Sequence, residues 1–200
     1  MFTGIIETTG QIENYTDESG NRTFWINSPL SSDLKIDQSV SHDGVCLTVE
    51  EVKGNSHRVT AIAETLKKSG IGSWEKGRLV NIERCMLMNG RLDGHIVLGH
   101  VDTTGKCISK KQEGNSWQFV FQISEEFSTL IIEKGSISIN GISLTIFNIK
   151  KNEFEVAIIP YTYEHTNMRK LEEGDVVNIE FDVIGKYVNR ILEVKGGKGR

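Results

Sequence analysis

Two side chains in this sequence combine reactive chemistry with apolar surroundings. Cys46 lies in the strand-like run 45–52, and His100 lies in the segment 94–105, GHIVLGHVDTTG. An imidazole can take up and return a proton at neutral pH, and a cysteine acts as a nucleophile where its thiolate is stabilised. A core histidine bonded to a backbone carbonyl and an inert buried cysteine are the alternative interpretations.

The spacing of the other reactive residues excludes several kinds of site. Cys46, Cys85 and Cys107 are odd in number and widely spaced, so they form neither a disulfide framework nor a zinc-ligand pair. The chain also lacks a P-loop, a Rossmann G-x-G-x-x-G motif and any cluster of histidine, cysteine and carboxylate at metal-ligand spacing. We therefore expect no cofactor and no metal ion.

An internal repeat organises these residues. Three segments occur twice, the first two at an offset of 97 residues and the third at 95: 39–49 and 136–146, 59–83 and 156–180, and 4–10 and 99–105. The second copy therefore carries two extra residues, between 123 and 136. A repeat of this length indicates a duplicated domain rather than a solenoid.

Comparison of the two copies separates binding roles, which should survive duplication, from chemical roles, which can differ. Hydroxyl groups recur in the pairs Ser39 and Ser136, Thr48 and Thr145, and Thr65 and Thr162. Cys46, by contrast, corresponds to Ser143, and His100 takes the place of Ile5. The two halves are therefore chemically unequal.

The other four histidines are weaker candidates for proton transfer. His95 begins the same segment as His100. His42, His57 and His165 have no histidine at the equivalent positions of the other half, and we interpret them as turn or surface residues. For His165, contact with the rim of a pocket is the alternative interpretation.

The composition is that of an ordinary soluble globular protein. Of the 200 residues 38% are hydrophobic and 25% charged, and the net charge of −4 offers no attraction for nucleic acid or an anionic membrane. No run approaches the roughly 18 apolar residues of a membrane span, and the N-terminus lacks the regions of a signal peptide. We expect a cytoplasmic protein.

Strand patterns dominate both halves. The predicted strands are 23–27, 45–52, 58–62, 79–83, 117–124, 136–139, 142–149, 154–159 and 176–181. Pro160 is expected to close one of them. Six short strands per half, separated by turns, are typical of a small closed barrel. The predicted fold is therefore all-β, with two tandem six-stranded barrels over 1–96 and 97–185.

Helical patterns are few. Residues 125–133 carry an amphipathic pattern behind Ser124, which could cap a helix. Residues 187–194 are amphipathic and lie outside the repeat, so we expect 186–200 to hold a short helix that serves assembly. The tail GGKGR, 196–200, is expected to be disordered.

Five segments together resemble riboflavin synthase: MFTGIIE at the start, DGVCLTV at 43–49, GHIVLGHVDTTG at 94–105, KGSISINGISLTI at 134–146 and IIPYTYEHT at 158–166. The resemblance covers essentially the whole chain. It implies Greek-key barrels, a homotrimer formed through the C-terminal helix, and dismutation of two 6,7-dimethyl-8-ribityllumazine molecules per site to riboflavin and 5-amino-6-ribitylamino-uracil. This chemistry needs positioning and proton transfer rather than an external cofactor, because the pteridine ring itself accepts electrons.

The resemblance also implies which residues form the site. Cys46 would be a nucleophile or a polar contact to the ring, His100 would move a methyl proton, Asp182 would orient a base or activate water, and Ser39 would join them. The substrate-binding residues would be Gly4, Ile5, Ile6, Cys46, Leu47, Thr48, Ala61, Ile62, Ala63, Glu64, Thr65, Gly99, His100, Val101, Lys134, Ser143, Leu144, Thr145, Ile159, Pro160, Tyr161, Thr162, Tyr163 and Glu164.

Two other functions stay open at this point. Lumazine- or flavin-binding optical proteins share the duplicated fold but catalyse nothing. A flavin-binding barrel of the reductase type would need a nicotinamide-binding α/β domain, which the chain lacks. Cys46, His100 and the intact second motif Ser143-Leu144-Thr145 favour the enzyme.

Overall fold

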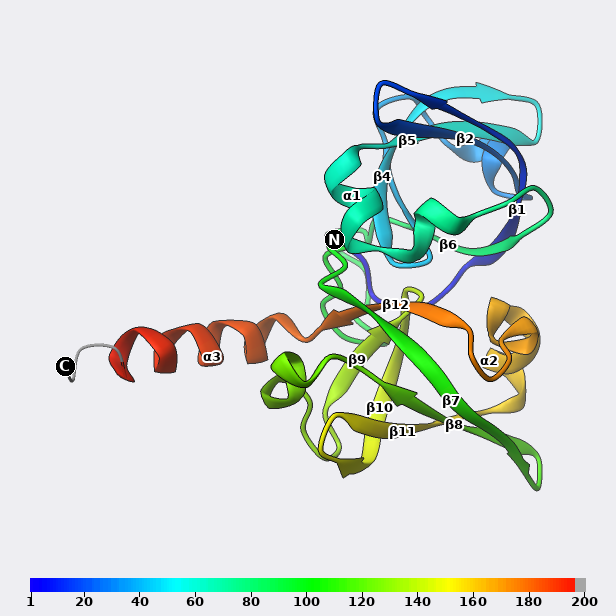
Figure 1. The fold of residues 1–200 in the computed structure, drawn as a ribbon. Helices are drawn as coiled ribbons and strands as arrows, with labels where there is room; N and C mark the ends of the chain where they lie inside the picture. The colour runs from blue at the N-terminus through cyan, green and yellow to red at the C-terminus, as the bar shows by residue number, and fades with distance from the viewer. Residues whose placement is uncertain (197–200) are drawn as a thin grey trace.

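Twelve strands close into two barrels of six, one from each copy of the repeat, in the computed structural model, which describes residues 1–196 (Figure 1). Around the N-terminal barrel the strands are β1 (Thr8–Glu18), β2 (Asn21–Asn27), β5 (Ser56–Ala61), β4 (Val45–Lys53), β3 (Ser39–His42) and β6 (Leu79–Arg84). Around the C-terminal barrel they are β7 (Thr103–Glu113), β8 (Ser116–Gln122), β11 (Glu153–Ile158), β10 (Ile142–Lys150), β9 (Ser136–Ile139) and β12 (Val176–Phe181). The order matches strand for strand, so the predicted pair of six-stranded barrels is confirmed.

Each barrel encloses its own core, because alternate residues of a strand point to the same side. Phe24 and Ile26 of β2 are fully buried, and so are Phe119 and Phe121 at the equivalent positions of β8. Burial of each such side chain contributes about 1.5–3 kcal/mol to stability. The buried apolar residues form two separate clusters, one per barrel, so each copy of the repeat has its own interior.

Three observed strands are missing from the predicted strands: β3 and the first strand of each barrel. β1 and β7 are each 11 residues long and mostly polar, with only Gly10 and Ile12 buried in β1. Antiparallel pairing of β1 with β2 and β6 defines the strand where apolar alternation does not. Such a strand leaves little hydrophobic signal in the sequence.

One short helix follows the fifth strand of each barrel, and neither helix was predicted. They are α1 (Ala63–Lys68) and α2 (Pro160–His165). Pro160 follows the end of β11 and occupies the first turn of α2, where its fixed φ and missing N–H are tolerated. Residues of α1 line the cleft described below.

Four short helical segments are of the 3₁₀ type. They are η1 (Ser31–Asp33), η2 (Gly70–Ser73), η3 (Glu125–Leu130) and η4 (Asn167–Lys170). The helix predicted over 125–133 is therefore shorter and of the 3₁₀ type. Ser124 does not cap it, because its hydroxyl donates to the Glu126 carboxylate instead (3.0 Å).

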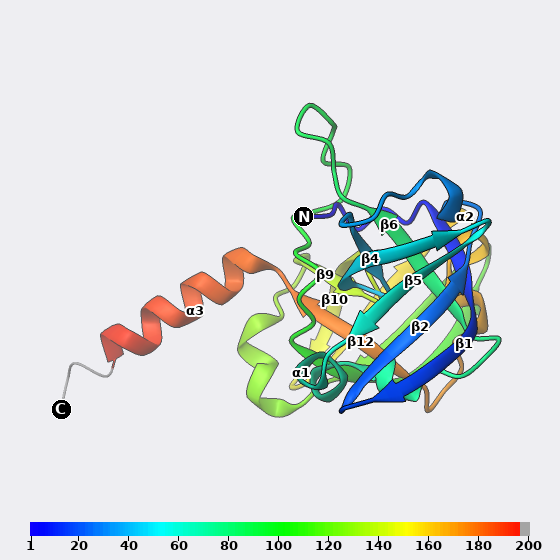
Figure 2. The same ribbon diagram turned by 90° about the horizontal axis from the view of Figure 1, so that it is seen from above.

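The C-terminal helix, α3 (Val183–Gly196), is 14 residues long and thus longer than the predicted 187–194. It projects away from both barrels in both views (Figures 1 and 2). Tyr187, Ile191 and Leu192 are 70%, 52% and 63% exposed, so the helix presents an uncovered apolar surface. The predicted disordered tail, apart from Gly196, lies outside the described residues. No helix within residues 1–196 is long and apolar enough to cross a bilayer.

A polar interface joins the barrels at a pseudo-twofold axis. Gly44 and Gly141 meet there, and a Cβ on Gly44 would lie 2.8 Å from the Gly141 nitrogen. Asp43 is fully buried beside them, and its Oδ1 accepts hydrogen bonds from the Asn81 amide (2.7 Å) and the Asn167 side chain (2.8 Å). Buried polar groups of this kind require partners in a defined geometry, so they fix how the barrels pack.

Two histidines interpreted above as turn or surface residues are buried in the N-terminal barrel, which corrects that interpretation. His42 and His57 are 0% exposed, and their Nε2 atoms lie 2.8 Å apart. His57 Nδ1 lies 2.8 Å from the Ser31 hydroxyl. Burial lowers the pKa of His57 to about 4 and that of His42 well below its usual value, so both rings stay neutral. His165 is exposed, as predicted.

Candidate active site

Two irregular segments cross between the barrels: the first strap, residues 2–7, and the second strap, residues 97–102. Phe2 and Val97 pair through two backbone hydrogen bonds of 2.7 and 3.1 Å. Each strap leads into the first strand of its own half but packs on the opposite barrel. Ile6 packs against the C-terminal core, and Val101 packs against the N-terminal core. Residues from both halves therefore meet wherever a strap crosses a barrel.

Glycine allows each strap to lie directly against a strand of the opposite barrel. The Cys46 amide on β4 donates to the Gly99 carbonyl (2.8 Å), and the Ser143 amide on β10 donates to the Gly4 carbonyl (2.8 Å). Both glycines have positive φ, and a Cβ on either would lie 2.6 Å from the Cβ of Cys46 or Ser143. Cys46 and Ser143 thus occupy equivalent positions under equivalent straps.

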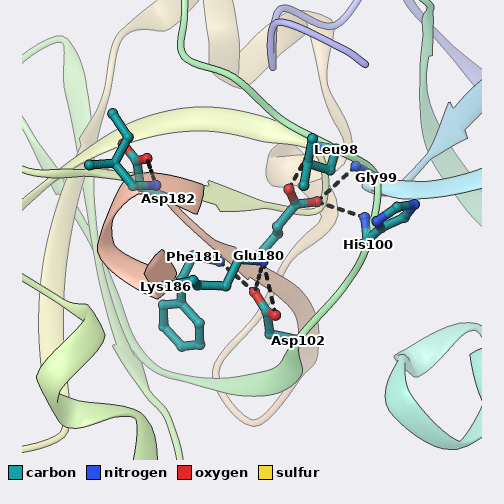
Figure 3. Close-up of polar contacts among 9 residues, drawn as sticks. Leu98, Gly99, His100, Asp102, Glu180, Phe181, Asp182 and Lys186 are labelled. Atoms are coloured by element: carbon teal, nitrogen blue, oxygen red, sulfur yellow. Dashed lines mark hydrogen bonds and ion pairs between the residues drawn. The ribbon is translucent and has the colours of Figure 1, made fainter. Parts of the chain in front are cut away.

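A glutamate at the end of each barrel's last strand holds the strap of the same half. Glu180 accepts hydrogen bonds from the amides of Leu98, Gly99 and His100, at 2.7, 2.9 and 2.8 Å (Figure 3). Glu83 accepts bonds from the amide and hydroxyl of Thr3 and from the next amide, at 2.6, 2.7 and 3.0 Å. Burial raises the pKa of both carboxyls, and these hydrogen bonds oppose the rise.

A cleft of about 390 Å³ lies between the second strap, β4 and α1. The reactive side chains around it are Cys46, Glu64, Thr65, Lys68, His100 and Asp102. A thiol, an imidazole, a hydroxyl and groups of both charges therefore face one space that is large enough for a small heterocycle.

The Cys46 thiol is half-buried and stays protonated at neutral pH. Desolvation raises its pKa above the usual value, and the Ser39 side chain only partly opposes this rise. Ser39 lies on β3, next to β4. A raised pKa is opposite to what an activated nucleophile needs, so this environment suits Cys46 as a polar contact.

His100 and Asp182 lie to either side of Glu180 (Figure 3). The His100 ring is exposed at the cleft, while its backbone is held by Glu180. Asp182 immediately precedes α3, and its carboxylate accepts a hydrogen bond from the Ile184 amide (2.9 Å). Within one chain, the predicted catalytic residues therefore lie in two places: Cys46, Ser39 and His100 at the cleft, and Asp182 beside the start of α3.

The second place is the surface under the first strap. His95 is buried there, and its Nδ1 lies 2.6 Å from the Ser143 hydroxyl. Burial lowers the His95 pKa, and the nearby Asp182 carboxylate opposes that shift. Ile5, the counterpart of His100, is 48% exposed at this strap. The His95 imidazole thus lies against the C-terminal barrel, close to the Ser143 hydroxyl and the Asp182 carboxylate.

The other predicted binding residues differ in what they can offer a ligand. Thr48 and Thr145 are exposed on β4 and β10, whereas Leu47 is buried in its core and Leu144 is half-buried against the other core. The ammonium group of Lys134 lies 5.4 Å from the centre of the Phe147 ring.

The residues before and within the short helices are mostly accessible. Ile62 and Ile159 precede α1 and α2 and are 57% and 61% exposed. Tyr161 is 68% exposed and stacks on His165, whereas Tyr163 stacks on Trp117 with ring centres 3.7 Å apart. The exposed and half-exposed predicted residues of these segments are Ile62, Ala63, Glu64 and Thr65, and Ile159, Pro160, Tyr161, Thr162, Tyr163 and Glu164. Ala61 is buried.

The sequence interpretation missed the groups that hold the straps. Glu83, Glu180, Asp102 and Lys186 were not among the candidates, nor was Lys68 at the cleft. A signal for the glutamates was present, because both copies of the segment VNIE end at these two residues.

A family model described as "Lumazine binding domain" matches the chain twice, over residues 3–85 and 98–182. The riboflavin synthase of Actinobacillus pleuropneumoniae is 38% identical over 193 residues, which cover 96% of this chain and 90% of that protein. The riboflavin synthase of Saccharomyces cerevisiae is 39% identical over 203 residues, covering 95% and 85%.

Among solved structures, LumP complexed with riboflavin superposes with a TM-score of 0.85 at 21% identity, covering 90% of this chain and 99% of that chain. LumP complexed with 6,7-dimethyl-8-(1'-D-ribityl) lumazine gives 0.83 at 21% identity, covering 90% and 98%. At this identity the likeness establishes the duplicated fold alone.

Proposed function

The chain belongs to the riboflavin synthase family of enzymes, and we propose that it converts two molecules of 6,7-dimethyl-8-ribityllumazine into riboflavin and 5-amino-6-ribitylamino-uracil. One lumazine donates a four-carbon unit to the other. The two products together contain every atom of the two substrates, so the balance needs no external oxidant or reductant. The full-length matches to riboflavin synthases and the two lumazine-binding domains support the assignment.

The observation that carries the proposal is the pair of strap-covered surfaces, which share the same backbone arrangement but differ in their reactive side chains. Cys46 and His100 lie at one, and Ser143 and Ile5 at the other. A dismutation uses two copies of one molecule in different roles. Two related sites that bind the same ring but differ in their reactive groups suit that requirement. Holding both reactants in register can contribute up to about 7–11 kcal/mol to lowering the barrier.

We assign proton transfer at the ring methyl group to His100, because its ring is exposed at the cleft on a strap fixed by Glu180. Cys46 contacts the ring as a thiol, and Ser39 supports it. Thr48, Thr65, Thr145 and Thr162, with the backbone of the straps and of the residues before α1 and α2, bind the two heterocycles. Asp182 acts at the C-terminal barrel.

The proposed active site is completed by a second subunit. Within one chain, His100 lines the cleft with Cys46, whereas Asp182 lies near His95, and α3 leaves an apolar surface uncovered. We propose a homotrimer held by α3, in which the N-terminal barrel, 1–96, of one subunit faces the C-terminal barrel, 97–185, of its neighbour. The three free cysteines suit the reducing cytoplasm.

Incubation of the purified protein with 6,7-dimethyl-8-ribityllumazine tests the proposal. We expect riboflavin absorbance to appear, with one riboflavin and one 5-amino-6-ribitylamino-uracil formed for every two lumazines consumed. The His100→Ala variant should turn over about 10²- to 10⁴-fold more slowly while still binding lumazine. Tight binding of lumazine by the wild type without riboflavin formation would instead identify a chromophore carrier, and full activity of His100→Ala would exclude His100 from proton transfer.

A further inference from the structure

Two carboxylates hold the second strap against β12: one on the strand accepts hydrogen bonds from the strap, and one on the strap accepts a hydrogen bond from the strand. Glu180 of β12 accepts hydrogen bonds from three consecutive strap amides, 98 to 100. Asp102 of the strap returns the contact, because its Oδ2 accepts a hydrogen bond from the Phe181 amide (2.9 Å). The strap is thus tied to the strand before and after His100 (Figure 3).

A lysine of the C-terminal helix completes the fastening. Lys186 Nζ lies 3.0 and 2.9 Å from the two Asp102 carboxylate oxygens. The two side chains are 25% and 22% exposed, so this ion pair is better shielded than a surface pair and holds its geometry more firmly. Through it, α3 is connected to the strap that carries His100.

The first strap has the same fastening with one difference. Glu83 holds the strap amides, Glu7 accepts a hydrogen bond from the Arg84 amide (2.7 Å), and the Arg84 guanidinium pairs with Glu7 (2.6 Å). Here the cation comes from the residue next to the glutamate, within the barrel itself. Only the strap that carries the imidazole depends on a cation from α3.

We propose that Glu180, Asp102 and Lys186 are positioning residues for His100, so that α3 helps to hold the proton-transfer group in place. The inference rests on the proposed function. Three hydrogen bonds to consecutive amides fix the backbone of His100 and aim its exposed ring along the cleft. The same bonds fix the Gly99 carbonyl, which accepts from the Cys46 amide (2.8 Å), so a shift of the strap also disturbs Cys46.

The test uses the full chain with two measurements: steady-state turnover of 6,7-dimethyl-8-ribityllumazine and amide hydrogen exchange followed by mass spectrometry. In Glu180→Gln, an amide group faces strap N–H donors that need acceptors. In Lys186→Met, the cation is lost while the stem length is kept. We expect kcat to fall about 10- to 100-fold in both variants while KM changes less than about threefold, because a small misplacement affects the reacting geometry more than binding.

Exchange should rise in residues 98–102 while the barrel strands stay protected. Lys186→Arg should restore kcat. Lys151→Met is the matched control, because it removes the lysine of an ion pair on the same barrel, with Glu125, whose two side chains are mostly exposed. Glu83→Gln should raise exchange in residues 2–7 and leave 98–102 unchanged.

Two results would overturn the proposal. One is unchanged kcat together with unchanged exchange at 98–102 in both variants. The other is a general rise of exchange over the C-terminal barrel, which would indicate a role in stability only. If the wild type itself forms no riboflavin, the proposed function fails, and the exchange data still decide whether these residues hold the strap.

Discussion

The buried carboxyl of Asp43 should make the protein less stable as the pH rises. Asp43 is 0% exposed at the interface between the barrels, and its Oδ2 has no hydrogen-bond partner. Desolvation raises its pKa from 3.8 to about 7, although Arg78 and the bonds from Asn81 and Asn167 oppose the shift. The folded protein therefore holds this proton more tightly than the unfolded chain does. The stabilising contribution is complete below the unfolded pKa and is lost as the pH rises towards 7.

The size of the effect follows from the shift. The rise of the Asp43 pKa from 3.8 to about 7 corresponds to roughly 4 kcal/mol of stability lost at pH values above 7. For pKa values of 3.8 and about 7, the part lost between pH 5 and pH 8 is roughly 2.5 kcal/mol. Asp43→Asn is the suitable variant, because Asn140 occupies the equivalent position with nearly the same φ, 47° against 46°. Asparagine also tolerates this left-handed conformation.

The assay is urea unfolding of the wild type and Asp43→Asn at pH 5 and pH 8. We expect the stability of the variant relative to the wild type to improve by roughly 2.5 kcal/mol between the two pH values. The new amide can cost about 1–3 kcal/mol at both pH values if its N–H groups find no acceptor, but this offset cancels in the comparison. A relative stability that is the same at both pH values, within about 0.5 kcal/mol, would refute the reasoning.

Two further predictions concern the N-terminal barrel. Replacing His42 and His57 by the Ile and Phe that occupy the equivalent core positions should reduce the loss of stability in acid. The lowered pKa of His57, about 4, means that stability is present above the unfolded pKa of about 6.5 and falls by up to roughly 3 kcal/mol as the pH drops towards 4. Thermal unfolding between pH 7 and pH 4.5 measures this, and an equally acid-sensitive double variant would contradict it. Cys46→Ser should keep kcat within about tenfold, because burial keeps the thiol protonated. A loss of about 10³-fold or more would argue for covalent attack by the thiolate.

The repeat and the turn residues were sufficient to predict the two barrels. Apolar alternation identifies strands such as β2 and β8, which bury phenylalanines, but not β1 and β7, which are held by backbone pairing. The short helices α1 and α2 were missed for a related reason. Six residues are too few to show a helical period.

Histidine burial shows where a general expectation about polar residues failed. His42 and His57 were assigned to turns or the surface because they have no histidine counterparts. Their counterparts, Ile139 and Phe154, are core residues, and that comparison points to the barrel interior. The sequence could not show that the two rings satisfy each other within 2.8 Å, because they are 15 residues apart on separate strands.

The site was predictable in part. The equivalence of Cys46 with Ser143 and of His100 with Ile5 follows from the repeat offsets. In the structure, Cys46 and Ser143 lie under equivalent straps, and His100 and Ile5 lie on those straps. The crossing of the straps to the opposite barrels was not predictable, because it depends on contacts such as Gly99 with Cys46 that no local pattern encodes.

The number of ligands bound per chain tests the central claim most directly, namely that the two barrels provide two unequal sites for the same heterocycle. Titration of the wild-type protein with riboflavin, followed by isothermal calorimetry and flavin fluorescence, would measure it. We predict two bound molecules per chain with distinguishable affinities, because Cys46 and His100 lie at one site and Ser143 and Ile5 at the other. Saturation at one molecule per chain, with no second site at higher concentration, would contradict the account.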